Sequence, residues 1–224
     1  MLLLSLIILA ASWAIQAILR SKFRTYSMTP LSSGLSGAEV ALKMLRDNRI
    51  YDVEVTCIPG QLTDHYNPAD KTINLSEEVF YGRNAAAAAV AAHETGHAIQ
   101  HATAYSFLQM RSALVPVVSV ASSWISWILL AGVFLIELTP LPLIIGIGLF
   151  ALITLFSLIT LPVEFDASRR AVEWLFNARV VDRSEYGMAK NALWWAAMTY
   201  VVAALGSIAT LVHYILILLG RSED

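Results

Sequence analysis

The sequence predicts a mainly α-helical membrane protein, with four transmembrane helices and a small α+β element on the cytoplasmic side. Composition, four apolar runs and the distribution of basic residues lead to this fold class. The 224 residues are 57% hydrophobic and only 14% charged, whereas about 25% of residues are charged in a typical soluble domain. Each uncharged run supplies the ~20 residues that a helix needs to cross a bilayer.

The apolar runs divide the chain into five segments. These are a transmembrane anchor (1–19), a cytoplasmic element (20–111), a two-span transmembrane hairpin (112–163), a cytoplasmic helix (164–190) and a last transmembrane helix (191–220). A cleaved signal has its basic residues before the apolar run, whereas Arg20, Lys22 and Arg24 follow the first run here. We therefore expect an uncleaved anchor.

The distribution of Lys and Arg orients these helices. Of the fifteen basic residues, nine lie in segment 20–111 and five in segment 164–190, which leaves only Arg221. Because cytoplasmic loops carry an excess of Lys and Arg, both segments are expected in the cytoplasm, with both termini outside, in a multi-pass protein of the cell membrane. The single cysteine, Cys57, excludes an intramolecular disulfide and agrees with a reducing compartment.

Shorter elements are expected within segment 20–111. Ser36 and Glu39 form a capping box that begins a helix running to about Asn48. Alternating apolar residues predict a strand from residue 51 up to the Pro59-Gly60 turn and a second strand at 71–75. A polar loop at 63–68 is expected between them, and a short helical turn capped by Ser76 after them.

A strongly helical stretch from Asn84 to about Arg111 carries a His-Glu-x-x-His pattern. Positions four apart differ by roughly 40° around a helix, so His93 and His97 can bind one metal ion from one face. Zinc accepts neutral imidazoles and one further ligand and keeps a position open for water, from which the neighbouring Glu94 can take a proton. The pattern points to a zinc hydrolase with one Zn²⁺ ion.

The third metal ligand has two candidates. His101 drifts roughly 80° from His93 around the helix, so we expect it to form a hydrogen bond beside the site or to be exposed. Glu164 follows Pro162, which should kink or restart the helix at the end of the third span. Topology returns Glu164 to the same membrane face as the histidines, although a glutamate in a first helical turn is also favoured by the helix dipole.

Other features near the pattern allow more than one interpretation. Gly96 costs ~1 kcal/mol relative to alanine in a helix, so it allows either close approach of a strand or substrate, or helix packing. The strand at 71–75 could offer its edge to a substrate backbone, or could simply be packed. Donors for a developing oxyanion could be His65, Tyr66, Arg169 or Arg170.

Two stretches carry a family resemblance. The nine residues from His93 to His101, followed by two spans and then Pro162 to Arg170, resemble the YugP-like neutral zinc metallopeptidases of bacterial membranes. The order of motif, two-span hairpin and returning glutamate is also similar to that of the HtpX-type and CaaX prenyl proteases. The resemblance implies a zincin-like cytoplasmic element with His93, His97 and Glu164 as metal ligands and Glu94 as the base.

One position departs from the pattern of these relatives. They carry an aspartate one helical turn after the ligand glutamate, where this chain has Ser168. Asp166, two residues after Glu164, is the remaining candidate for orienting a ligand histidine.

These observations together predict a membrane-embedded, zinc-dependent metalloendopeptidase that cleaves peptide or membrane-protein substrates at the cytoplasmic face of the lipid bilayer. The alternative is a non-enzymatic metal-binding membrane protein or transporter. A transporter should bury ionisable residues within its spans, and only His213 lies there. No glycine-rich phosphate loop or basic cluster indicates nucleic-acid binding.

Overall fold

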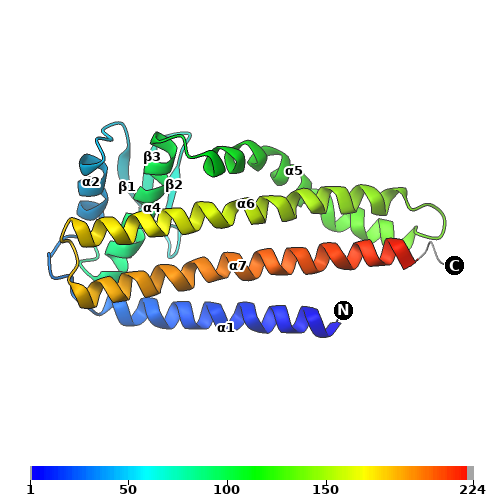
Figure 1. Ribbon diagram of the computed structural model, residues 1–224, viewed down its shortest axis with the longest axis horizontal. Coiled ribbons are helices and arrows are strands. Elements are labelled where there is room, and N and C mark those ends of the chain that lie inside the picture. Colours follow the sequence, from blue (N-terminus) through cyan, green and yellow to red (C-terminus); the bar gives the residue numbers. More distant parts are fainter. Residues whose placement is uncertain (1, 221–224) are drawn as a thin grey trace. The chain divides into compact units, whose positions relative to one another are not determined.

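The computed structural model describes residues 2–220 and is mostly helical (Figure 1). In chain order the elements are α1 (Leu2–Ser27), α2 (Gly37–Asp47), β1 (Glu54–Ile58), β2 (His65–Asn67), β3 (Thr72–Ser76), α3 (Glu77–Phe80), α4 (Ala85–Ala102), α5 (Ser106–Phe134), α6 (Leu141–Asn177) and α7 (Arg183–Gly220). The predicted class, mainly α-helical with a small α+β element, is confirmed, and the structure shows that the strands form a mixed sheet.

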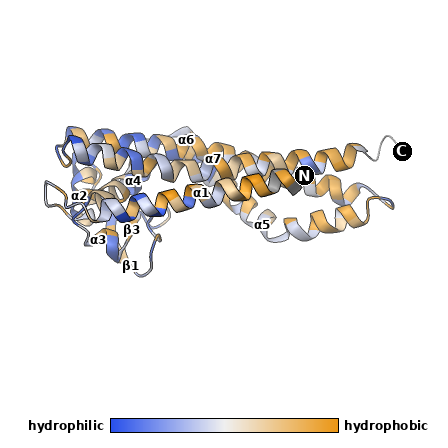
Figure 2. Ribbon diagram, turned by 90° about the horizontal axis from the view of Figure 1, so that it is seen from below, coloured by the Kyte–Doolittle hydropathy of each residue, from blue (hydrophilic) through white to orange (hydrophobic). Residues whose placement is uncertain are grey.

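Four of these helices are long and apolar enough to cross a membrane, judged by length and composition. The candidate spans are Leu6–Ser27 in α1, Ser106–Phe134 in α5, Leu141–Asn177 in α6 and Arg183–Gly220 in α7. Apolar residues dominate long parts of these helices (Figure 2). α6 and α7 have 37 and 38 residues, far more than the ~20 residues of a single crossing. Each helix therefore has a part that a single crossing does not need.

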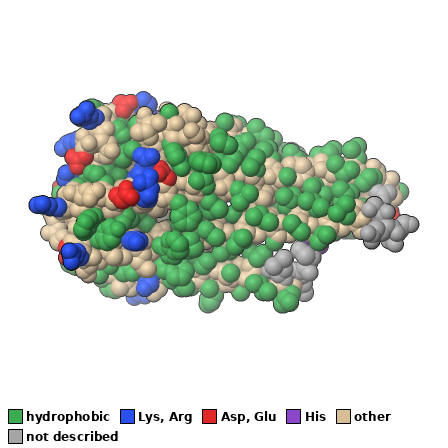
Figure 3. Space-filling model, viewed as in Figure 1, with side chains coloured by type: hydrophobic (Ala, Val, Ile, Leu, Met, Phe, Trp, Pro, Cys, Tyr) green, Lys and Arg blue, Asp and Glu red, His purple; other side chains and the backbone are tan. Residues whose placement is uncertain are grey.

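The described chain forms two compact units, of which the first is almost free of charge. This apolar unit comprises residues 2–13, Gln109–Leu161 and 199–220. In its described residues only Arg111 and Glu137 carry a full charge. Ile125 and Leu129 of α5 pack with Leu143 of α6 in a small core. Hydrophobic side chains cover this unit on the face drawn in Figure 3.

The second unit comprises Ala14–Leu108 and Pro162–Met198 and is called the site unit below. Its sheet has the order β1-β3-β2, with β1 parallel and β2 antiparallel to β3. Ile73 and Leu75 of β3 are fully buried and pack in one core with α2, α4 and the last part of α6. Charged side chains gather on this unit in Figure 3.

The predicted capping box is confirmed at the start of α2. Ser36 Oγ accepts a hydrogen bond from the Glu39 backbone N–H at 3.2 Å, and the Glu39 carboxylate accepts one from the Ser36 backbone N–H at 2.7 Å. The helix ends at Asp47, one residue before the expected end. Local sequence determined this element because both partners lie within one turn.

The sheet corrects two expectations about the strands and supports the packed role, one of the two left open for the strand at 71–75. The first strand begins at Glu54 rather than at residue 51. Residues 63–68 are not simply a loop, since residues 65–67 form β2 by pairing with β3. β3 is the central strand, with β1 and β2 on its two sides, so a substrate cannot add to it. Ser76 stands at the N-cap of α3 but donates its hydroxyl hydrogen bond to Asp64 instead.

Two helix boundaries also differ from the prediction. The helix that begins at Ala85 ends at Ala102 rather than near Arg111. Ala104 adopts a left-handed conformation (φ 51°) that turns the chain before α5. The sequence has no glycine at this position that would predict the turn. In contrast, α6 continues through Pro162 without a restart. A proline removes one helical hydrogen bond, and the fully buried Val163, Ala167 and Ala171 keep the helix packed beyond it.

Candidate metal centre

Helix α4 places the histidines of the motif on one face. Asn84 caps the helix by accepting a hydrogen bond from the Ala87 backbone N–H at 2.9 Å, and the alanines that follow are buried. The rings of His93 and His97 lie side by side, with centroids 4.8 Å apart and planes at 80°. Because alanine favours the helical state and leaves room for close packing, this segment holds the rings on a rigid, buried element.

Glu164 of α6 meets both histidines. Its Oε2 lies 3.3 Å from His93 Nε2 and 3.7 Å from His97 Nε2. The ligand atoms of the three residues all lie within 4.8 Å of one another, and the Glu164 side chain is only 3% exposed. Donor atoms 2.0–2.1 Å from a tetrahedral zinc ion are roughly 3.3 Å apart. Two imidazole nitrogens and a carboxylate oxygen at these separations are a donor set that suits Zn²⁺.

Gly96 brings α6 close enough for this contact. A Cβ atom at this position would lie 2.8 Å from the Ala167 carbonyl oxygen and 3.1 Å from its Cα. The backbone of α6 therefore occupies the space that a side chain on α4 would need. Of the two explanations open from the sequence, helix packing is the one that the structure supports, and it places Glu164 one turn before Ala167.

Each histidine also forms a hydrogen bond through Nδ1. Ser168 Oγ lies 3.2 Å from His93 Nδ1, and Gln100 Oε1 lies 3.0 Å from His97 Nδ1. Such partners fix the orientation and tautomer of a metal-binding imidazole. Ser168, one helical turn after Glu164, therefore contacts His93 itself.

Gln100 determines which nitrogen of His97 can bind a metal. Its Nε2 donates to the Val163 carbonyl at 2.8 Å and to Asp166 Oδ2 at 2.9 Å, so its Oε1 must be the atom that faces His97. An amide oxygen only accepts, and His97 Nδ1 is therefore the protonated nitrogen. Nε2, which faces Glu164, keeps its lone pair for a metal.

Asp166 acts on the histidine through Gln100 and not directly. Its carboxylate accepts hydrogen bonds from Arg169 and Arg170, both at 2.6 Å, and from Gln100. These contacts hold the carboxylate against the fully buried Gln100 side chain. The candidate named from the sequence lies beside the site, but Gln100 is the residue that touches His97.

Glu94 is held by the edge strand of the sheet. Its Oε2 accepts a hydrogen bond from the Tyr66 backbone N–H at 3.0 Å, and the residue is 8% exposed. Tyr66 lies on β2, which has β3 on one side only. Because its N–H points to Glu94 and not to β3, the open edge of β2 faces the carboxylate.

The proposed oxyanion donors already have partners of their own. The Tyr66 hydroxyl lies 2.7 Å from His101 Nδ1. His65 contacts the Thr63 carbonyl through Nδ1 and Asn74 through Nε2. His101 is exposed and lies outside the group of three ligand residues, where it ties α4 to β2.

The electrostatic environment of His97 favours its protonated form. Burial lowers the pKa of His97, but the hydrogen bond and charge of Glu164, with smaller contributions from Glu94 and Gln100, outweigh it and raise the pKa above its usual value. A cation is therefore favoured at this position, whether it is a proton or a metal ion.

These features describe a helical protein with candidate membrane spans and a buried site suited to zinc. Residues 1–219 match the family model described as "Putative neutral zinc metallopeptidase", and the chain belongs to this family. The chain is 43% identical over 213 residues to the "Putative membrane protease YugP" of Bacillus subtilis (strain 168), which covers 95% of this chain and 93% of that protein. No solved structure matches. The resemblance to the YugP-like family is confirmed.

Three contacts at the site were not predicted from the sequence: those of Gln100, Ser168 and the Tyr66 backbone N–H. Gln100 follows His97 by three residues, and Ser168 follows Glu164 by four, so helical spacing alone places each near the ligand face. Tyr66 contributes its backbone N–H, and the type of its side chain does not indicate this role.

Proposed function

We propose that this protein is a zinc-dependent endopeptidase. The proposal rests mainly on the group of His93, His97 and Glu164. Glu94 follows His93 directly on α4. Membership of a family named for zinc metallopeptidases supports the proposal. When bound, zinc supplies a Lewis acid that polarises the scissile carbonyl and lowers the pKa of a water molecule.

We assign the role of general base to Glu94. Its Oε2 is held by the Tyr66 N–H, so Oε1 is the oxygen that takes the proton from water. The same carboxylate then returns this proton to the leaving amine. Gln100 and Ser168 keep the two imidazoles oriented throughout, because they bind the nitrogens that do not face Glu164.

The open edge of β2 is the place where we propose that a substrate backbone binds. An extended peptide can add to an exposed sheet edge through main-chain hydrogen bonds. Tyr66 lies on this edge and also contacts Glu94, so a peptide paired here would pass beside the base. This replaces the edge expected at residues 71–75.

We further propose that the site works at the cytoplasmic face of the cell membrane, on peptides or on segments of membrane proteins. The excess of Lys and Arg in segments 20–111 and 164–190 supports this orientation. α6 contains both a candidate span and Glu164. In this proposal the same helix crosses the membrane and contributes a ligand to the metal site.

The substitution Glu94→Gln tests the role of the base. It preserves the shape of the side chain but removes the group that accepts a proton, so we expect kcat to fall by ~10²–10⁴-fold with zinc content unchanged. Peptide cleavage by the purified full-length protein and elemental analysis give the two readings. Glu77→Gln, an exposed carboxylate on α3, is the matched control. Equal cleavage by parent and Glu94→Gln protein would falsify this mechanism.

A further inference from the structure

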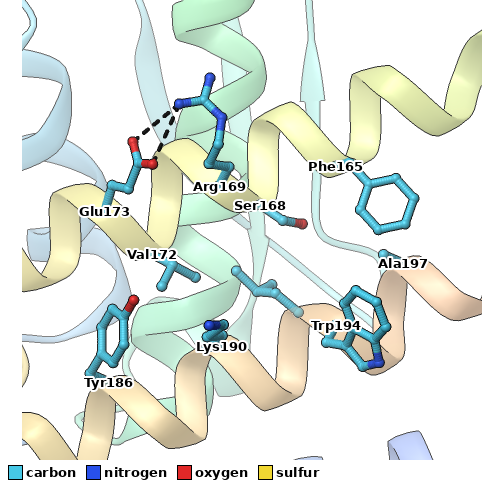
Figure 4. A pocket seen from close by; sticks show the side chains of 10 residues that line it. Phe165, Ser168, Arg169, Val172, Glu173, Tyr186, Lys190, Trp194 and Ala197 are labelled. Carbon is cyan, nitrogen blue, oxygen red and sulfur yellow. Dashed lines mark hydrogen bonds and ion pairs between the residues drawn. The ribbon is translucent and has the colours of Figure 1, made fainter.

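A cavity of about 270 Å³ lies between α6 and α7 within the site unit (Figure 4). Phe165, Leu193, Trp194 and Ala197 form its apolar wall. The rings of Phe165 and Trp194 have centroids 6.2 Å apart, and Figure 4 shows them with Ala197 at one end of the cavity. The mechanism proposed above uses none of these four side chains.

The cavity adjoins the metal-binding group through Ser168. This residue lines the cavity, and its Oγ lies 3.2 Å from His93 Nδ1. Phe165, at the apolar end, directly follows Glu164 in the chain. A group in the cavity is therefore separated from a ligand histidine by a single side chain.

Size and chemistry limit what the cavity can hold. Pockets for whole small ligands usually measure ~300–1,000 Å³, so this one suits a single large side chain. Its wall of rings and aliphatic groups favours an apolar occupant, since burial of apolar surface contributes roughly 25 cal/mol per Å².

Lys190 supplies a charge at the rim of the cavity. Its side chain is exposed and lines the same cavity. Among the described residues, no carboxylate forms an ion pair with it, whereas Arg169 at the other side is paired with Asp166 and Glu173. The ammonium group can therefore interact with an acidic group on a bound molecule.

We infer that this cavity is a specificity pocket, which receives a large apolar side chain of the peptide substrate next to Ser168, the residue that contacts His93. Lys190 adds a preference for an acidic residue next to that side chain. The inference rests on the proposed peptidase function and names the substrate class: peptides with a bulky apolar residue and a neighbouring carboxylate.

The first experiment fills the cavity. Full-length, zinc-loaded protein in detergent is given a degenerate peptide library, and cleavage sites are read by mass spectrometry. Ala197→Phe should lower kcat/KM for peptides with Phe or Leu at the selected position by ~10–200-fold relative to Ala-containing peptides. Trp194→Ala, which enlarges the cavity, should shift selection toward larger side chains. Ala203→Phe, at an exposed position of the same helix, should leave the profile unchanged.

The second experiment tests the rim. Lys190→Gln should reduce the preference for an acidic neighbour by about twofold to fivefold, as expected for an exposed charge pair, with the apolar preference retained. An unchanged acidic preference would remove Lys190 from the proposal.

A binding measurement distinguishes this inference from the peptidase proposal. Glu94→Gln protein is mixed with a peptide carrying benzoylphenylalanine and irradiated, and the labelled residues are mapped. Labels in residues 162–198 that disappear with Ala197→Phe support the pocket, even if no variant cleaves any peptide. In that case only the peptidase proposal fails. Identical cleavage profiles for the parent, Ala197→Phe and Trp194→Ala proteins overturn the pocket. A co-purified lipid that Ala197→Phe displaces, without a change of profile, also overturns it.

Discussion

The two units differ in how far in sequence their polar side chains reach for partners. In the apolar unit, hydroxyl groups bond to carbonyl groups of their own helix, as Thr154 does with Phe150 and Thr160 with Phe156, at 3.0 and 2.8 Å. In the site unit, Thr95 also bonds to its own helix, at the Ala91 carbonyl, but other polar groups join elements far apart in sequence. Gln100 of α4 reaches Asp166 of α6, and Glu94 reaches Tyr66 of β2.

The difference agrees with the candidate membrane spans of the apolar unit. A hydroxyl that bonds to its own helix is satisfied wherever that helix lies, which suits an apolar solvent that offers no partner. A side chain that bonds to another element depends on the position of that element. Changes to polar groups should therefore be nearly silent in the apolar unit and costly in the site unit.

The largest contrast is expected between two glutamates. Glu164→Ala removes one of three ligand groups, so zinc affinity should fall by more than ~100-fold, beyond the 10–100-fold typical of residues that only support ligands. Zinc content after dialysis against a weak chelator gives the measurement. Glu137→Ala, in the apolar unit, should retain zinc. Equal zinc content in both variants would remove Glu164 from the ligand set.

A second contrast compares two buried polar side chains. Gln100→Leu leaves His97 Nδ1 without its acceptor, and we expect zinc affinity to fall by ~10–100-fold. Thr154→Val removes a hydroxyl that serves only its own helix, so affinity should stay within twofold or so. Competition with a fluorescent zinc chelator measures both. If the two variants behave alike, the difference between the units does not extend to metal binding.

The pH dependence of zinc binding sharpens the role of His97. Its raised pKa means that a proton competes with zinc already above pH ~6.5, the usual value for histidine. Zinc affinity should fall as the pH decreases through the raised pKa, by up to about tenfold per pH unit for each proton displaced, and level off above it. Calorimetry in two buffers of different ionisation enthalpy would detect the released proton. A flat affinity from about pH 8 to 6 contradicts this account.

The smallest contrast concerns two glycines at helix contacts. Gly96→Ala places a Cβ 2.8 Å from the Ala167 carbonyl, and Gly132→Ala places one 2.6 Å from Leu143 Cα. Overpacking typically costs 1–3 kcal/mol, so both variants should unfold at lower temperature. Only Gly96→Ala should also weaken zinc binding, because it moves α6 away from α4. Zinc affinity reduced equally by both changes would speak against a local effect.

Local patterns predicted a large part of the fold. The apolar runs identified four helices long enough to span a membrane, and Ser36 with Glu39 identified the start of α2. Each of these patterns is formed by residues that are close together in the sequence. β2 was missed because its three residues are polar and form a strand only by pairing with β3, and the end of α4 was missed because Ala104 turns the chain without a glycine.

For the candidate site, the spacing of His93, Glu94 and His97 was sufficient to propose zinc, since the periodicity of one helix brings the two imidazoles together. Glu164 was chosen by topology and family resemblance, and the structure brings it within 3.3 Å of His93. The role of Gln100 depends on where α6 packs, which no local pattern contains.

The sequence by itself determined the class of the protein, its apolar helices and the pair of histidines that are candidate metal ligands, because composition and helical periodicity are local properties. Only the tertiary structure decided that Gly96 serves the approach of α6, that Gln100 orients His97, and that β2 is the open edge beside Glu94. Each of these depends on the packing of segments far apart in the chain, and the cavity beside Ser168 arises in the same way.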